Sequence, residues 1–335
     1  MDRPTDRQTI EKSYFTDTLK KKRMEMDENQ NFIINRSKFY VTIILQLSAI
    51  IISLFIFVFF YKHKRELKIL HNQTLLLLVI VAFIQLTIDL PMPVYFFYHG
   101  RVIPATPGYC TWWTYIEFSL NLISELLMAT FSIQRHILIF QSHLFNRRLY
   151  RLLFYFIPLT ICIVYPLVIY LFLIIIYPCD GTQWPYTMNT CGFATCYVVY
   201  SKFLALYDAL IHNNLPIYII ILSNIVLIIR VLNEKRRLNR PLTWKQNARM
   251  ALQLLVVSMV FLISWSPTIV IFVAQQITSS TIFSDSASVF AFDMIYCVPL
   301  FLPWVCFALL PECQKWIRKL FRRENISLNS VQPTL

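Results

Sequence analysis

Glycine and charged residues are both scarce in this chain, which has 4 glycines in 335 residues and only 15% charged residues. So little glycine counts against flexible linkers and low-complexity tails. The chain also lacks the HExxH, GxSxG, P-loop and dinucleotide-binding motifs, and its polar segments are too short for a soluble catalytic domain. We therefore expect neither enzymatic activity nor a bound cofactor or metal.

Long apolar runs are abundant instead, and 57% of the residues are hydrophobic. A soluble domain of this length does not bury so much apolar surface, whereas a membrane helix needs about 20 mostly apolar residues. Because lipid offers the backbone no hydrogen-bond partners, each span must be helical. The sequence therefore predicts an all-α membrane protein, a seven-transmembrane helix bundle within residues 39–310, with spans at Phe39–Tyr61, Gln73–Tyr98, Tyr109–His136, Tyr150–Tyr177, Ser201–Arg230, Gln246–Gln275 and Ser288–Leu310.

Lysines and arginines indicate how this bundle is oriented. They gather after the first, third and fifth spans and in the C-terminal segment, whereas the opposite connections carry Arg101 and Lys202. The positive-inside rule then makes residues 1–38 an extracellular tail of a multi-pass plasma-membrane protein with a cytoplasmic C-terminus. The run KKKR at 20–23 opposes this orientation, but the connecting loops together outweigh it. The net charge of +13 thus reflects topology, and we expect no nucleic-acid partner.

The cysteines agree with this orientation. Cys110, Cys179, Cys191 and Cys196 all fall on the predicted extracellular side, where an even number of cysteines predicts disulfides. Metal binding is the alternative, but no CxxC motif or neighbouring histidine supports it. The sequence leaves open which cysteine pairs with Cys110. Cys313 lies beside the membrane on the cytoplasmic side and is a candidate for lipidation, with a plain thiol as the alternative.

Several motifs stand in spans three, five, six and seven. The segment FLISWSP at 261–267 is similar to the pattern FxxxCWxP, and Arg135 follows Cys110 by 25 residues. Pro216 and Pro303 stand in the fifth and seventh spans. In this order and spacing, the motifs resemble those of the rhodopsin-like G-protein-coupled receptors, in character closest to the neuropeptide receptors. The resemblance implies an extracellular ligand and a heterotrimeric G protein as partners.

The chain departs from that family at three sites. The DRY motif is Gln134-Arg135-His136, the NPxxY motif is Leu302-Pro303-Trp304-Val305-Cys306, and Ala82 replaces the acid that binds sodium. The segment 311–323, which includes PECQKWIRKLF, resembles the family's amphipathic cytoplasmic helix, and 324–335 follows as a tail. The chain is thus expected to be a divergent member.

The resemblance implies a conformational switch in the sixth span. Pro267 should kink the helix because proline removes a backbone hydrogen bond. Trp265 would then form the floor of an outer cavity, with Phe261 one turn beneath it, and a ligand on Trp265 would shift the helix between two packings. Pro216 and Pro303 would belong to the same switch. A kinked helix with a core tryptophan is the alternative.

Arg135 would contact the G protein. In the family, this arginine is held by the neighbouring acid and by an acid on the sixth helix, but here Gln134 is neutral and the matching position is Asn247. We therefore expect raised basal activity. The alternative is an arginine that extends to lipid phosphates at the membrane edge.

Acidic residues inside the spans suggest the ligand. Asp89, Glu117, Asp208 and Asp293 should border the outer cavity, while Glu125 lies deeper and is expected to be structural. Each charge costs roughly 2.5–3.5 kcal/mol at the bilayer centre, so each side chain must face the bundle interior. No lysine or arginine is expected at matching depth. We therefore expect an extracellular cationic ligand, although protonated or water-bridged carboxyls are the alternative.

Glu117 is the expected anchor, since it lies about 27 Å along the helix from Arg135 at roughly 1.5 Å per residue. Amine receptors of the family keep an aspartate at this depth. An amidated, arginine-containing peptide is expected first and a biogenic amine second. Two rival functions remain: a chemosensory receptor for odorants, which would need a more apolar cavity, and a transporter or channel that uses the buried acids.

Overall fold

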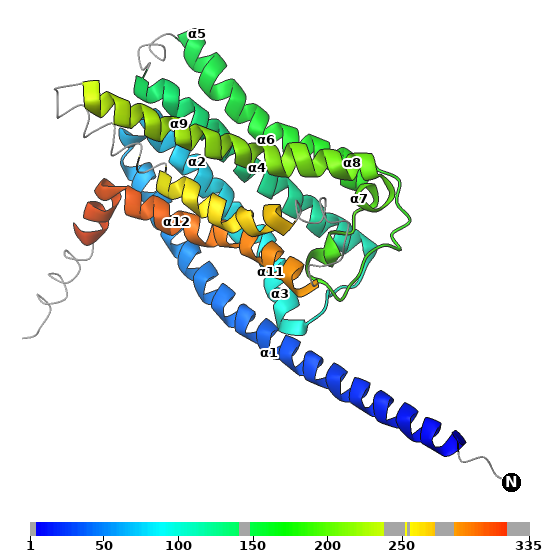
Figure 1. Ribbon diagram of the computed structural model, residues 1–335. Helices are drawn as coiled ribbons and strands as arrows, with labels where there is room; N and C mark the ends of the chain where they lie inside the picture. Colours follow the sequence, from blue (N-terminus) through cyan, green and yellow to red (C-terminus); the bar gives the residue numbers. More distant parts are fainter. Residues whose placement is uncertain (1–4, 141–147, 238–251, 253–254, 272–284, 320–335) are drawn as a thin grey trace, which may run out of the picture.

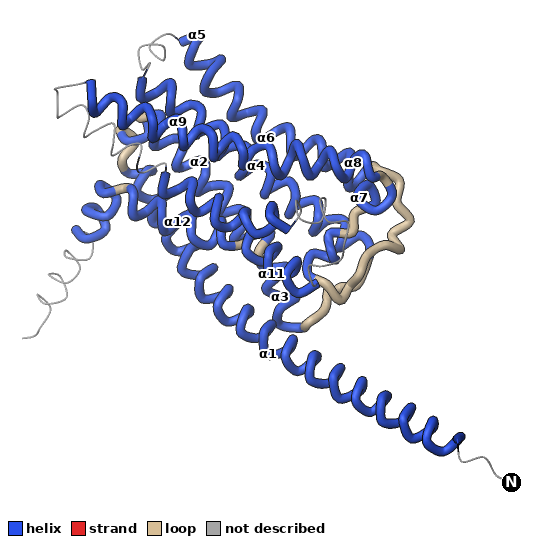
Figure 2. The backbone as a smooth tube through the Cα atoms, viewed as in Figure 1, coloured by secondary structure: helices blue, strands red, loops and turns tan. Residues whose placement is uncertain are grey.

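The computed structural model describes residues 5–140, 148–237, 252, 255–271 and 285–319. All regular secondary structure in these residues is helical (Figure 2). The residues described include a shorter apolar helix, Leu255–Ile271, and six helical spans long and apolar enough to cross a membrane: Phe32–Lys62, Asn72–His99, Pro107–Ile137, Arg148–Ile176, Lys202–Asn233 and Phe290–Leu309. The predicted all-α bundle is confirmed, and each predicted span corresponds to one of these helical segments.

The elements run in the predicted order along the chain (Figure 1). The α-helices are α1 (Thr5–Lys62), α2 (Leu70–Ile84), α3 (Pro91–His99), α4 (Pro107–Phe140), α5 (Arg148–Arg151), α6 (Ile157–Tyr170), α7 (Cys196–Tyr200), α8 (Lys202–Tyr207), α9 (Leu215–Arg237), α11 (Asp285–Ile295) and α12 (Cys297–Leu309). Short 3₁₀ turns are η1 (Glu66–Lys68) and η6 (Asn189–Phe193), and π-helical segments are η2 (Gln85–Asp89), η4 (Leu152–Phe156), η5 (Leu171–Ile176) and η7 (Asp208–Asn214).

The π-helical segments interrupt spans that the sequence predicts as single helices. In the second span, η2 separates α2 from α3, which starts at Pro91. In the fifth span, η7 separates α8 from α9, and Pro216 is the second residue of α9. Because proline has no N–H to donate, the helix must rearrange the hydrogen bonds of the turn before it. Such π turns are frequent at functional sites, and two of the buried acids, Asp89 and Asp208, lie in them.

Helix α1 is much longer than the predicted span. Its 58 residues correspond to about 87 Å at roughly 1.5 Å per residue. It extends far beyond the other helices at the end of the bundle where α3 and α7 lie (Figure 1). The polar segment before Phe39 therefore continues the membrane helix as one rod, and Lys38 is part of it.

Helix α4 forms the centre of the bundle. It packs against α2, α6 and α9, and 67% of its most apolar window is buried, compared with 28% for the span Lys202–Asn233. Leu127, Met128 and Phe131 on α4 belong to the main core. The outer helices present apolar side chains such as Leu222 to their surroundings, as contact with lipid requires. Polar residues of α4 must therefore meet other helices.

After α12 the chain turns and continues as a helix at 311–319. This helix packs on the first span, where the Lys62 ammonium lies 5.4 Å from the centroid of the Trp316 ring. Cys313 is fully buried in this contact, and burial raises the pKa of its thiol to about 11. Lipidation of Cys313 stays a prediction, and the buried thiol counts against it. Residues 324–335, the predicted tail, lie outside the described residues.

Candidate functional site

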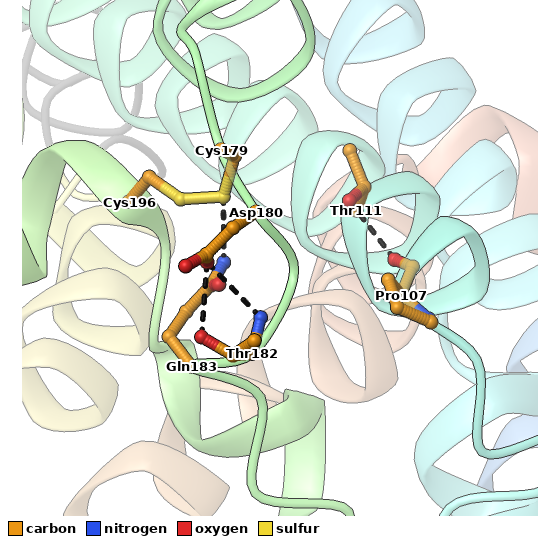
Figure 3. The surroundings of a disulfide bond; sticks show 7 residues. All are labelled: Pro107, Thr111, Cys179, Asp180, Thr182, Gln183 and Cys196. Atoms are coloured by element: carbon orange, nitrogen blue, oxygen red, sulfur yellow. Dashed lines mark hydrogen bonds between the residues drawn. A yellow bond between two sulfur atoms is a disulfide. The ribbon is translucent and has the colours of Figure 1, made fainter.

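Two disulfides lie at one end of the bundle, which we call the disulfide end. Cys110 at the start of α4 pairs with Cys191, and Cys179 pairs with Cys196. The side-chain amide of Gln183 donates to Cys179 Sγ over 2.9 Å (Figure 3). These bonds resolve the pairing that the sequence leaves open. The described residues contain no group of three or more His, Cys, Asp or Glu side chains arranged for a metal ion.

The first disulfide anchors a loop that folds over the bundle. Thr190, Cys191 and Phe193 have φ values of 48°, 49° and 55°, in the left-handed region that is costly for residues other than glycine. The bond from Cys191 to Cys110 fixes this turn on α4. Phe193 then lies between two bundle rings, with centroids 5.9 Å from Phe118 and 4.5 Å from Phe292. The loop thus covers the interior of the disulfide end.

A cavity of about 280 Å³ lies beneath this loop. Its lining is mostly apolar and aromatic, and it includes Trp265 and Asp208 of the predicted site. Glu117, Asp89 and Asp293 are not among the lining residues. Of the four acids of the predicted site, Asp208 alone therefore lies on the wall of this cavity.

Glu117 and Asp89 form a buried carboxyl pair beside the cavity. Their side chains are 2% exposed and lie within hydrogen-bonding reach of each other. Asp89 Oδ1 has no hydrogen-bond partner in the described residues. In this part of the chain neither carboxyl forms an ion pair with a lysine, arginine or histidine. Two acids in contact inside a membrane bundle favour a cation or a shared proton between them.

Asn121 separates this carboxyl pair from the cavity. Its side chain lines the cavity, while its amide nitrogen donates to Glu117 Oε1 over 3.1 Å. Its oxygen accepts a 2.9 Å bond from the Gln85 amide. The Tyr296 hydroxyl donates to Glu117 Oε2 over 3.2 Å. Glu117 is thus one side chain away from the cavity, and its two donors, Asn121 and Tyr296, are neutral groups that a cation can displace.

Asp208 is surrounded by donors. The hydroxyls of Tyr170 and Tyr197 donate to its two carboxylate oxygens over 2.9 and 3.0 Å, and His212 Nδ1 lies 2.6 Å from Oδ1. His212 Nε2 in turn lies 2.7 Å from the Tyr165 hydroxyl. The sequence does not indicate this network, because the tyrosines come from α6 and α7. A ligand cation would meet an already satisfied carboxylate at Asp208.

Asp293 has a cationic partner, so the expectation that no lysine lies at matching depth is wrong. Lys38 Nζ lies 2.5 Å from Asp293 Oδ2, and the amide of Asn189 donates to Oδ1 over 3.3 Å. The expectation failed because it placed Lys38 in a tail before the first span, whereas α1 carries it to the face of α11. Asp293 and Lys38 line a separate groove between α1 and the α11–α12 pair.

The residues predicted to form the switch include two in the core, Phe261 and Trp265. Phe261 is fully buried, and Trp265 is 4% exposed with no hydrogen-bond partner for its Nε1 among the described residues. Pro267 lies within the helix Leu255–Ile271 and Pro303 within α12. The kink at Pro267 stays a prediction.

Glu125 is expected from the sequence to lie deeper in the bundle than the other predicted acids. It is 1% exposed, and neither of its carboxylate oxygens has a hydrogen-bond partner in the described residues. Its structural role stays a prediction.

Arg135 lies at the opposite end of α4 and is only 3% exposed. Its charge interacts with the thiol of Cys306 on α12, and its burial counts against a contact with lipid phosphates. The amide of Gln134 donates to Phe154 O over 3.0 Å, and His136 Nε2 donates to Ser223 O over 2.9 Å. The neighbours of Arg135 in sequence are therefore engaged by other helices. Asn247 lies outside the described residues.

Comparison with known proteins gives one family. The model for the 7 transmembrane receptor (rhodopsin family) matches residues 53–305, more than half of the 335 residues. A search of curated proteins found no match. The family match agrees with the helical order, with the Arg135 and Trp265 motifs and with the buried interior described above. The chain belongs to the rhodopsin family of seven-transmembrane receptors, which signal through G proteins.

Proposed function

We propose that this receptor binds an extracellular cationic ligand whose positive group pairs with Glu117. The observation that carries the proposal is the buried carboxyl pair of Glu117 and Asp89, which forms no ion pair in the described part of the chain. Each charge costs roughly 2.5–3.5 kcal/mol at the bilayer centre, and a bound cation offsets this cost. The other two acids are less suitable, since Asp208 is satisfied by three donors and Asp293 is paired with Lys38.

The path from the cavity to Glu117 passes Asn121. An ammonium group in the cavity would take the place of the Asn121 amide on Glu117 Oε1, and the aromatic rings would hold the rest of the ligand. A charged donor forms a stronger bond to a carboxylate than a neutral amide does. The exchange therefore favours the ligand once it has entered.

The cavity limits the size of the bound group. Its volume of about 280 Å³ is at the lower end of ligand pockets, which are typically about 300–1,000 Å³. Phe193 and its loop cover it. An amidated, arginine-containing peptide would insert one terminal residue. A biogenic amine is the second candidate, and the small volume favours it because such a ligand fits whole.

We further propose that Arg135 contacts the G protein and that basal activity is raised. Arg135 has the neutral Gln134 as its neighbour, and the Gln134 amide is occupied by the carbonyls of Phe154 and Tyr155. The arginine thus lacks the adjacent acid that restrains it in related receptors. A ligand on Trp265 would shift the helix that carries Phe261 and Pro267 and so complete activation.

Dose–response curves in cells test the ligand anchor. Tyramine, phenethylamine and an amidated Arg-Phe dipeptide are compared on the native receptor, Glu117→Gln and Glu125→Gln at matched surface expression. We expect Glu117→Gln to raise the half-maximal concentration about 30- to 5,000-fold, because removing one partner of a desolvated charge pair costs about 2–5 kcal/mol. Glu125→Gln is the control, since Glu125 is a buried acid of the same helix whose carboxylate oxygens have no hydrogen bond to a cavity-lining side chain in the described residues, whereas Glu117 is bonded to Asn121. Unchanged potency of these ligands in Glu117→Gln would refute the cationic anchor.

A further inference from the structure

The wall of the cavity on η7 carries two consecutive asparagines, and their orientation is fixed. The amide nitrogen of Asn214 donates to Ala209 O over 2.6 Å, and that of Asn213 donates to Asp208 O over 3.3 Å. A backbone carbonyl can only accept, so the NH₂ group of each side chain must face it. Both bonds reach back five residues, which is the spacing of the π-helical turn. The amide oxygens are therefore directed away from these carbonyls.

The oxygen of Asn214 is unsatisfied. Asn214 lines the cavity, its side chain is buried, with 4% of the residue exposed, and Oδ1 has no hydrogen-bond partner among the described residues. A buried acceptor without a partner costs about 1–3 kcal/mol. Most buried polar atoms in folded proteins have a partner, and a bound ligand or water would supply the one that Asn214 Oδ1 lacks.

A second unsatisfied atom lies on another wall of the same cavity. Trp265 also lines it and is 4% exposed, and its Nε1 has no partner in the described part of the chain. The indole N–H is a donor only. Two residues that line the cavity thus carry unsatisfied buried atoms, an acceptor on η7 and a donor on the helix Leu255–Ile271.

We propose that the cavity recognises a carboxamide group of the ligand, whose N–H donates to Asn214 Oδ1 and whose carbonyl accepts from Trp265 Nε1. A carboxamide carries its donor and its acceptor on different atoms, so it serves two walls of a cavity at once. An ammonium or guanidinium group has no acceptor, and a hydroxyl must serve both partners from one oxygen. The proposal rests on the proposed function, because the cationic group at Glu117 holds the carboxamide in the cavity.

This inference narrows the ligand class. A ligand with both a cation and a carboxamide is an amidated amino acid or the amidated end of a peptide, rather than a simple amine. Asp208 stays satisfied by its own tyrosines and histidine in this arrangement. The cation and the carboxamide then bind to different helices, Glu117 on α4 and Asn214 on η7.

Three small probes test the proposal on purified full-length receptor in lipid nanodiscs. Phenylalaninamide carries the cation and the carboxamide, phenylalanine N,N-dimethylamide lacks the N–H donors, and phenylalaninol has a hydroxyl in place of the amide. Affinities are obtained from the rise of the unfolding temperature with probe concentration. We expect phenylalaninamide to bind about tenfold more tightly than either analogue, the effect of one or two neutral hydrogen bonds.

Variants assign this preference to the two atoms. In Asn214→Leu and in Trp265→Phe, the ratio of affinities should fall towards one. Asn224→Leu is the control, because Asn224 is buried on the same span but does not line the cavity. If Asn214→Leu does not fold, the ratio of affinities is measured in Trp265→Phe only. A tenfold preference that persists in the folded variants would overturn the proposal.

Two further outcomes separate this inference from the cationic anchor. Equal affinity of the three probes for the native receptor, or no binding of phenylalaninamide at millimolar concentration, overturns the carboxamide site. If Glu117→Gln still weakens all three probes alike, the anchor at Glu117 stands without the carboxamide site. If Glu117→Gln has no effect while the preference depends on Asn214, the carboxamide site stands and the anchor does not.

Discussion

The ion pair of Lys38 and Asp293 offers a sharp test of how the site is divided. The two side chains are 28% and 14% exposed, and their charged atoms lie 2.5 Å apart. In Lys38→Gln the Asp293 carboxylate keeps the Asn189 amide as a neutral donor and loses its cation. Hydrogen bonds to charged groups contribute about 1.5–3 kcal/mol, so we expect a loss of about 2 kcal/mol. At about 2–4 °C per kcal/mol, the unfolding temperature should fall by about 4–8 °C.

A double-mutant cycle measures the pair itself. Lys38→Gln, Asp293→Asn and the double variant are compared by thermal unfolding in one detergent, with tryptophan fluorescence as the signal. The double variant should be no less stable than Lys38→Gln alone, because the uncompensated carboxylate is gone. Lys315→Gln is the control, since Lys315 and Glu312 are 64% and 58% exposed and should contribute little.

The same variants show whether Asp293 binds ligand. Because its carboxylate is already paired, we expect Asp293→Asn to leave the potency of cationic ligands unchanged within about threefold. Strictly additive losses of stability in the cycle would refute the pairing. A loss of potency as large as that of Glu117→Gln would return Asp293 to the ligand site.

Two further predictions concern the cysteines. Cys191→Ser opens a loop of 81 residues, which should cost about 4.5 kcal/mol by loop entropy and sharply reduce surface expression. Cys297→Ser is the control, because Cys297 forms no disulfide and its loss should leave expression unchanged. Equal expression of the two variants would contradict this prediction. Cys313 should react slowly with iodoacetamide at pH 8, because a pKa raised from 9.0 to about 11 leaves about a hundredfold less thiolate. Mass spectrometry measures the rate of labelling. Rapid labelling would show that the helix at 311–319 exposes the thiol.

The helices were predictable because lipid forces every apolar run of sufficient length into a helix. The interruptions were not, since a hydropathy pattern contains no signal for the π turns at Gln85–Asp89 and Asp208–Asn214. Even Pro91 and Pro216, which the sequence displays, do not reveal which hydrogen bonds rearrange around them. These turns determine where Asp89 and Asp208 point, so the shape of the site depends on a feature that the sequence hides.

Some of the residues in and beside the cavity are named by the sequence prediction, and others are not. The sequence identifies Glu117 and Trp265 by their spacing from Arg135 and Pro267, and the structure places Trp265 on the cavity and Glu117 one side chain behind it. It does not reveal Asn214, because an asparagine in an apolar helix becomes informative only when its unsatisfied oxygen is seen. The cysteine pairing likewise depends on how the loop folds over α4 rather than on spacing.

The central proposal is that this receptor contacts the G protein through Arg135, which follows the neutral Gln134 in the sequence. The most direct test measures unliganded G-protein activation in cells that express the native chain or Arg135→Ala at matched surface levels. We predict a signal above that of untransfected cells that disappears in Arg135→Ala. A native signal that persists unchanged in Arg135→Ala, or no unliganded signal from the native chain, would contradict the account.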